Sequence, residues 1–353
     1  MGQSNRIFYY DALRAIAIMG IIFCHASVSF ILLGVDNDNF YISAFYDCFR
    51  DFSIPIFVML SGALLILKKD SFKDFFKKRL SRILIPFVFW VLIYIVYSSI
   101  YIVHGFNLSN SIDIFFGTSS TLGVAFWFIW MIIIAYFLIY VVNWLTAYNY
   151  KIINIFTLMS LVYIFICQFG LFNPYSSKLV YFVSFMSYII IGYYISHNNY
   201  LENIISPNKI VLVTLIISVA SYAYYIFCYV VPTSISHGQF IYMGYFSLPI
   251  LLMSVNIFLL FKYLSKSNAF LKMERNSVGM IITTISKYSF GIYLAHYVIL
   301  HSLKLNLSKF IDFSSQNPII WIPIIVILTL MISILVLAIL NRIPYLSKFS
   351  GNS

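Results

Sequence analysis

The sequence predicts an all-α, polytopic membrane protein with about ten transmembrane helices. Of its 353 residues, 62% are hydrophobic and only 9% are charged, whereas soluble domains carry about 25% charged residues. The apolar residues are gathered in stretches of roughly 17–26 residues, long enough to cross about 30 Å of hydrocarbon as a helix. The stretches lack the alternation typical of a membrane β-barrel, so helices are the expected spanning elements.

The expected spans follow one another along the whole chain. They cover residues 8–33, 45–67, 83–103, 124–146, 152–170, 178–197, 209–231, 241–262, 288–304 and 318–340. No change in composition marks a domain boundary, so residues 1–353 are expected to form a single integral-membrane domain. The first span has too long an apolar core for a cleavable signal peptide, and no small-residue cleavage site follows it.

Lysine and arginine predict the orientation of the spans. With the N-terminus inside, 17 of the 22 lie in inner segments and 4 in outer segments, while Arg14 lies within the first span. Such a bias is typical of cytoplasmic loops, so both termini are expected on the cytoplasmic side of a bacterial inner membrane. The net charge of +11 is then explained by topology and not by nucleic-acid binding. The four cysteines form no CxxC or Cys/His cluster, so neither a metal site nor a disulfide framework is expected.

Three ionisable residues interrupt the first span: Asp11, Arg14 and His25. Such residues are costly in lipid and by default mark a functional site. Arg14 and His25 are separated by about three helical turns, or about 16 Å, and Asp11 falls near the same line. All three are therefore expected on one face, with Arg14 near the cytoplasmic surface and His25 near the middle of the bilayer. A simpler alternative is a local pair between Asp11 and Arg14, with His25 hydrogen-bonded to a neighbouring helix.

These residue types suit acid–base chemistry. A buried histidine titrates near neutrality and can act as a general base, which makes His25 the candidate for proton abstraction. Asp11 is expected to pair with Arg14 and to hold its guanidinium group in place.

A basic run, KKDSFKDFFKKRLSRILIPF at residues 68–87, leads into the third span. Its lysines are explained by a cytoplasmic loop that attracts anionic lipid. Arg79 and Arg82 differ, because their i,i+3 spacing places them on one helix face. Guanidinium groups bind phosphate through two parallel hydrogen bonds. Together with Arg14, these two arginines are candidates for binding the phosphates of a cytosolic cofactor.

The motifs resemble, in order, those of the acyltransferase family three membrane enzymes. YDALRAIAIMGIIFCH resembles the family's first-span signature, IPIFVMLSGALL its second-span motif, and KRLSRILIPFVFW its Arg-x-x-Arg entry to the third span. FWFIWMIIIAY and SFGIYLAH are similar to weaker, later motifs. The resemblance implies about ten helices, acetyl-CoA or a related acyl-CoA as cytosolic donor, and acyl transfer to glycans or related cell-envelope molecules. It implicates Arg14, His25, Arg79 and Arg82, with Asp11 in support.

Two features depart from the family pattern. Many members have His-Leu before the Trp-Phe pair, where this chain has Ala125 and Phe126, so any role of that histidine is missing here. Some members carry a C-terminal hydrolase-like domain that receives the acyl group, whereas this chain ends about 13 residues after its last expected span. Transfer is thus expected to finish within the membrane domain or to pass to another protein. This short form is similar to O-acetyltransferases of surface polysaccharides, including those acting on enterobacterial common antigen.

The leading hypothesis is a membrane-bound O-acetyltransferase that moves an acetyl group from acetyl-CoA to a hydroxyl of a cell-surface or lipid-linked glycan. Arg79, Arg82 and Arg14 would hold the phosphates and His25 would be the base. The alternative is a transporter or flippase of a lipid-linked glycan, and a third hypothesis is a non-catalytic partner in an envelope assembly complex. A flippase does not need the ordered arginine and histidine motifs. The sequence does not indicate the oligomeric state or the acceptor hydroxyl.

Overall fold

The computed structural model describes residues 6–31, 38–118, 122–234, 244–311 and 316–351, and these contain helices but no strand. The α-helices are α1 (Phe8–Ile31), α2 (Asp38–Asp47), α3 (Phe49–Leu65), α4 (Phe72–Tyr101), α5 (Leu108–Phe116), α6 (Trp127–Tyr148), α7 (Ile152–Gln168), α8 (Lys178–Ser184), α9 (Met186–His197), α10 (Pro207–Ser234), α11 (Leu248–Leu264), α12 (Asn268–Glu274), α13 (Ser277–Leu307) and α14 (Pro318–Arg342). Short 3-10 helices are η1 (Val124–Phe126), η2 (Tyr200–Asn203) and η4 (Ser347–Phe349). The expected end of the first span at 32–33, the expected start of the eighth at 241–243 and most of the loop between the seventh and eighth spans lie outside the described residues.

The predicted all-α, polytopic membrane fold is confirmed. Within the described ranges, eight helices are long and apolar enough to cross a membrane, or nine if α11 and α12, which bend by 86° at their junction, form one span. The apolar helix α7 has 17 residues, or about 26 Å, which is shorter than the hydrocarbon thickness of about 30 Å. The number of full-length spans is therefore lower than the ten expected, because two of the expected spans are a short helix and a bent pair.

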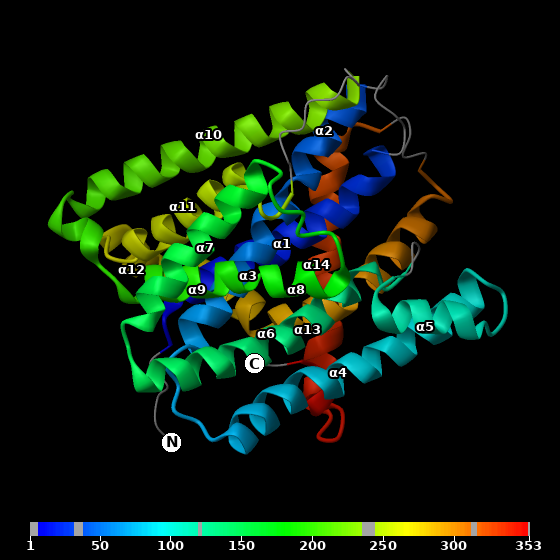
Figure 1. The fold of residues 1–353 in the computed structure, drawn as a ribbon. Coiled ribbons are helices and arrows are strands. Elements are labelled where there is room, and N and C mark those ends of the chain that lie inside the picture. The colour runs from blue at the N-terminus through cyan, green and yellow to red at the C-terminus, as the bar shows by residue number, and fades with distance from the viewer. Residues whose placement is uncertain (1–5, 32–37, 119–121, 235–243, 312–315, 352–353) are drawn as a thin grey trace.

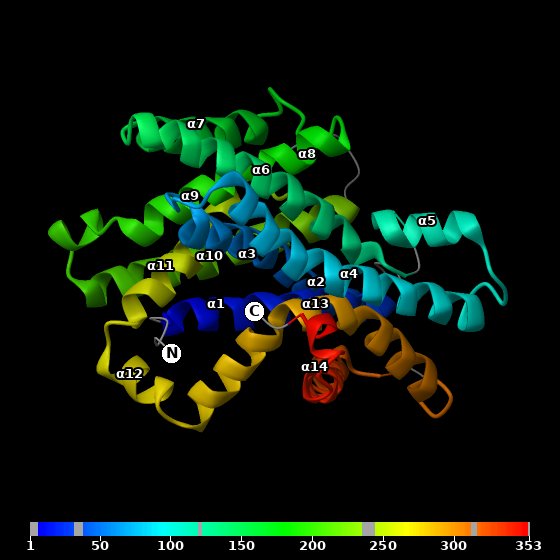
Figure 2. The ribbon, with the colours of Figure 1, turned by 90° about the horizontal axis from the view of Figure 1, so that it is seen from below.

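Helix α1 lies inside the bundle, where it packs against α2, α3, α13 and α14 (Figures 1 and 2). Helix α10 lies along the outside, and α14 crosses the other long helices obliquely (Figure 1). The central place of α1 explains how a span can carry Asp11, Arg14 and His25. Asp11 and Arg14 pair with each other, and the His25 ring packs against rings of α13, so none of the three has to face lipid.

Helices α3 and α9 cross at two glycines. A Cβ atom added to Gly62 would lie 1.8 Å from the carbonyl oxygen of Ile189, and one added to Gly192 would lie 2.3 Å from that of Met59. Both contacts are too short for any side chain, so the backbones approach as closely as small residues allow.

The chain after α14 folds back into the bundle. The Phe349 ring stacks on Phe89 of α4 at 4.8 Å, and Ser350 and Gly351 are buried. A Cβ atom on Gly291 of α13 would lie 2.1 Å from the carbonyl oxygen of Ser350. The backbone of this tail thus occupies space that glycine leaves open on α13.

One cavity is lined both by Arg14, in the first half of α1, and by Gly351, after the last helix. The N-terminal and C-terminal parts of the chain therefore lie on the same side of the helix bundle. The positive-inside bias predicts that this side is cytoplasmic. We expect Lys69→Cys to react with a membrane-impermeant maleimide only after spheroplasts are opened, and Gly105→Cys to react in intact spheroplasts.

The parent protein, which keeps its four native cysteines, measures the background labelling. Cys24, Cys48 and Cys167 are buried and Cys228 is partly exposed, so this background is expected to come from Cys228. The reverse labelling pattern would invert the orientation and place the cavity on the outer side.

Candidate active site

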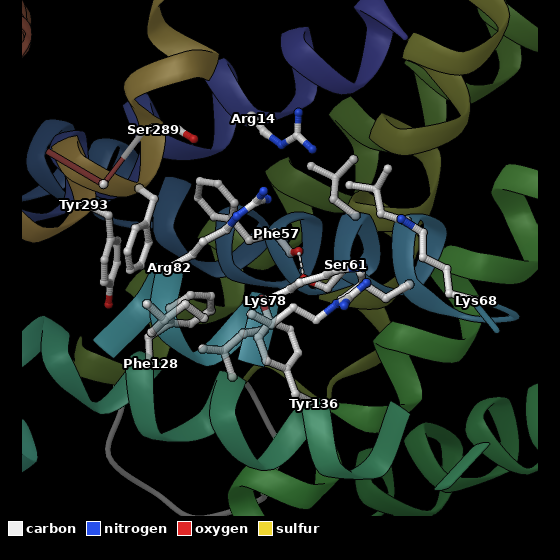
Figure 3. A pocket seen from close by; sticks show the side chains of 18 of the residues that line it. Arg14, Phe57, Ser61, Lys68, Lys78, Arg82, Phe128, Tyr136, Ser289 and Tyr293 are labelled. Atoms are coloured by element: carbon white, nitrogen blue, oxygen red, sulfur yellow. Dashed lines mark hydrogen bonds between the residues drawn. The ribbon is translucent and has the colours of Figure 1, made fainter. Parts of the chain in front are cut away.

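A cavity of about 560 Å³ opens among α1, α3, α4, α6 and α13, a volume within the range of small-molecule sites (Figure 3). It is lined by Arg14, Phe57, Leu60, Ser61, Leu64, Leu65, Lys68, Asp70, Lys78, Arg79, Arg82, Ile83, Phe128, Ile132, Tyr136, Ser289, Phe290, Tyr293 and Gly351. One part of this lining is strongly cationic and another is apolar, so the cavity suits a ligand that has an anionic end and an uncharged end.

The cationic part brings together three of the arginines predicted from the sequence. The five cations of the lining are Arg14, Lys68, Lys78, Arg79 and Arg82, and Asp70 is the one carboxylate. In Figure 3 the side chains of Arg14 and Arg82 extend toward the same part of the cavity from different helices. Arg82 is exposed, and no ion pair holds it within the part of the chain that the structure describes. Its guanidinium is therefore available to an anionic ligand.

Arg79 is held in place more firmly than Arg82. Its Nη2 lies 3.0 Å from a carboxylate oxygen of Asp70, and its Nη1 donates to the carbonyl oxygen of Phe75 at 3.2 Å. The guanidinium also lies over the Phe75 ring, 4.1 Å from its centroid. Its Nε is buried and has no hydrogen-bond partner among the described residues. An unpaired charged donor is costly, so this group favours a ligand in the cavity that accepts from it.

Asp11 and Arg14 form the predicted pair, with an Nη1–Oδ1 distance of 3.3 Å. Asp11 is buried and accepts two further hydrogen bonds, from Arg6 at 2.5 Å and from the Ser286 hydroxyl of α13 at 2.6 Å. The carboxylate is therefore well satisfied, and it joins α1 to α13 at the level where Arg14 enters the cavity. The Arg6 and Ser286 contacts were not predicted.

Aromatic rings line the far end of the cavity from Lys68. The centroid of the Phe128 ring lies 6.3 Å from that of Phe57 and 5.2 Å from that of Tyr293. Figure 3 shows Tyr293 and Lys68 at opposite ends of the cavity. The Tyr293 hydroxyl donates to the carbonyl oxygen of Ala125. This end of the cavity is apolar, in contrast to the cationic end.

His25 does not line the cavity, although it lies on the same helix as Arg14. The residue is partly exposed, and the centroid of its ring lies 4.9 Å from that of Tyr297 and 5.3 Å from that of His296, both on α13. The His296 ring in turn lies 5.8 Å from that of Tyr293, at the end of the cavity. The Lys304 ammonium donates to the carbonyl oxygen of His25 at 3.1 Å. His25 is thus connected to the cavity through two rings of α13.

A second polar network, which the sequence analysis missed, lies beside His25. Arg50 of α3 is 3.3 Å from a carboxylate oxygen of Asp51 and 3.9 Å from one of Asp47. The Asp51 carboxylate also accepts from Tyr225 at 2.9 Å, and the thiol of Cys24 donates to Asp47 at 3.2 Å. A signal was present, since Asp47, Arg50 and Asp51 are three ionisable residues at helical spacing. In the described ranges, no group of three or more His, Cys, Asp or Glu residues is arranged to hold a metal ion.

The comparison with protein families decides the class of the protein. Residues 7–338 match the model of the acyltransferase-3 family, described as an acyltransferase domain. The chain belongs to this family. No curated protein and no solved structure matches it. The acyltransferase-3 chain is thus a multi-pass membrane acyltransferase, and the cavity with its cationic and apolar parts is its candidate active site.

Proposed function

We propose that this acyltransferase moves an acetyl group from acetyl-CoA to a hydroxyl of a cell-surface or lipid-linked glycan. The observation that carries the proposal is the cavity, which combines Arg14, Arg79 and Arg82 with an apolar end within one enclosure. Coenzyme A has the same division, with phosphates at one end and an uncharged arm that ends in the thioester. Arginine binds phosphate bidentately, so the three arginines are the proposed phosphate ligands.

In the proposed reaction, His25 takes the proton of the acceptor hydroxyl. The hydroxyl oxygen forms a bond to the thioester carbonyl carbon, the carbon–sulfur bond breaks, and the proton passes from His25 to the departing sulfur. The products are the acetyl ester and CoA. General-base assistance supplies about 10²–10⁴-fold of the rate, so much of the remainder is assigned to the positioning of donor and acceptor.

Mass analysis of surface and lipid-linked glycans, in cells with and without the protein, tests this function. We expect acetyl groups to be lost with the protein, and membrane vesicles that contain it to release CoA from acetyl-CoA only when the glycan acceptor is present. A flippase would move the glycan without consuming acetyl-CoA, and a non-catalytic partner would tolerate His25→Ala. Unchanged acetylation together with no CoA release would refute the proposal.

Asp70 gives a prediction specific to this cavity. Its carboxylate pairs with Arg79 at 3.0 Å and with Lys78 at 3.8 Å, so it competes with the donor's phosphates for both cations. We expect Asp70→Asn to tighten CoA binding about fivefold, since partly exposed ion pairs contribute about 1 kcal/mol or less. Calorimetric titration of the detergent-solubilised protein with CoA measures the change.

Asp74→Asn is the matched control, because Asp74 lies nearby on α4, is exposed and does not line the cavity. We expect its affinity for CoA to equal that of the parent. Weaker binding by Asp70→Asn would instead assign Asp70 the role of orienting Arg79.

A further inference from the structure

His296 is a fully buried histidine that the proposed reaction does not use. It is 0% exposed, and its Nδ1 lies 2.6 Å from the carbonyl oxygen of Tyr293, one turn back on α13. A carbonyl oxygen only accepts hydrogen bonds, so Nδ1 carries the proton of the neutral ring. Nε2 is then left with a free lone pair, and this atom is buried without a hydrogen-bond partner among the described residues.

The ring of His25 lies next to the His296 ring. The centroids of the two imidazoles are 5.3 Å apart and their planes meet at 31°. An in-line hydrogen bond between two imidazole nitrogens places the centroids about 5 Å apart. The separation of the two rings would permit such a bond, although Nε2 of His296 makes none among the described residues. Catalytic hydrogen bonds are often long in the free enzyme and shorten when substrate binds.

The backbone of α13 is adapted at the same level. The Tyr94 hydroxyl donates to the carbonyl oxygen of Leu294 at 2.9 Å and accepts from the amide of Val298 at 3.1 Å. In a regular helix these two backbone groups bond to each other. Tyr94 is 1% exposed, so its hydroxyl is fixed inside the ladder. This insertion ties the turn of α13 that carries His296 to α4.

We propose that His296 is a positioning residue for His25, whose ring N–H it accepts at Nε2. This rests on the proposed function, in which His25 is the base. The hydrogen bond fixes the tautomer of His25, so that its other nitrogen carries the lone pair that takes the hydroxyl proton. That proton later leaves His25 for the sulfur of CoA, and His296 keeps its own proton at Nδ1 throughout. The arrangement follows the logic of a base oriented by a third group.

The test compares His296→Met with His296→Gln, which have similar volumes but differ in their ability to accept a hydrogen bond. We expect His296→Met to lower kcat for acetyl transfer about 10–100-fold, the usual effect of losing a partner that orients a functional ligand. KM for acetyl-CoA should stay unchanged, because His296 does not line the cavity. His296→Gln should recover most of kcat, since its carbonyl oxygen can accept from His25.

His301→Met is the matched control on α13, where His301 bonds to the Tyr97 hydroxyl at 3.0 Å. We expect its kcat to match that of the parent. Melting temperature and CoA affinity are measured for each variant. The inference is overturned if His296→Met keeps full kcat, if Gln and Met lose kcat equally, or if the loss follows the melting temperature. A parent protein that transfers no acetyl group would overturn the proposed function instead.

Discussion

His25→Gln is expected to lower kcat for acetyl transfer by about 10²–10⁴-fold, the contribution of a general base. Glutamine reaches about as far as histidine and can replace a structural hydrogen bond, but it has no basic nitrogen. CoA binding should be unchanged, because His25 does not line the cavity that holds the arginines. His25→Ala should show the same loss.

The measurement is acetylation of surface glycans in cells that produce each variant, with CoA titration of the purified proteins as a test of folding. His301→Gln serves as the control, because it removes a histidine bonded to Tyr97 on the neighbouring helix and should leave acetylation at the parent level. Substantial acetylation by His25→Gln would show that this histidine has a structural role only.

The residue pairs that the sequence correctly predicted to be neighbours are close together in the chain. Asp11 and Arg14 are three residues apart on α1 and form an ion pair. Arg79 and Arg82 are three residues apart on α4 and line one cavity. Helical spacing alone predicts both relationships, since residues i and i+3 share a face. The all-α membrane fold could also be predicted from the sequence, because the length and composition of each span indicate a membrane helix.

The contacts that the sequence did not predict join distant segments. The Ser286 hydroxyl meets Asp11 across 275 positions of the chain, and the His25 and His296 rings belong to α1 and α13. Periodicity within one helix carries no information about which face of another helix it meets. His296 lies in the SFGIYLAH motif, but only the packing of α13 on α1 shows that its ring lies next to that of His25.

The sequence predicted the position of His25 only in part. Helix geometry gives its distance along α1 from Arg14, about 16 Å, but not what lies between His25 and the arginines. The structure places the rings of Phe128 and Tyr293 at the end of the cavity and His25 beyond them, against α13. Under the proposed function, contact between the donor and His25 would therefore require Tyr293 or its neighbours to shift.

Arg82→Ala is expected to weaken CoA binding by about 1.5–3 kcal/mol, or about 10–150-fold, the range for a hydrogen-bonded charged group. Arg82 lines the cavity, is exposed and is held by no ion pair in the described ranges, so all of its hydrogen-bonding capacity is available to phosphate. Arg82→Lys should restore binding only in part, because an ammonium group lacks the planar fork.

Arg79→Ala should also weaken binding of CoA. In that variant, Asp70→Asn should restore part of the loss by removing the carboxylate that Arg79 neutralised.

Calorimetric titration with CoA measures these affinities, and Lys77→Ala is the control, since Lys77 is an exposed cation on the same helix that does not line the cavity. At the same ionic strength, the affinity of Lys77→Ala for CoA should equal that of the parent, because Lys77 does not contact the cavity. A general electrostatic attraction to the basic segment would instead weaken equally for every cation removed. Equal losses for Lys77→Ala and Arg82→Ala would therefore indicate a diffuse attraction. Unchanged affinity in both Arg79→Ala and Arg82→Ala would refute the phosphate site and leave the basic run as a determinant of membrane topology.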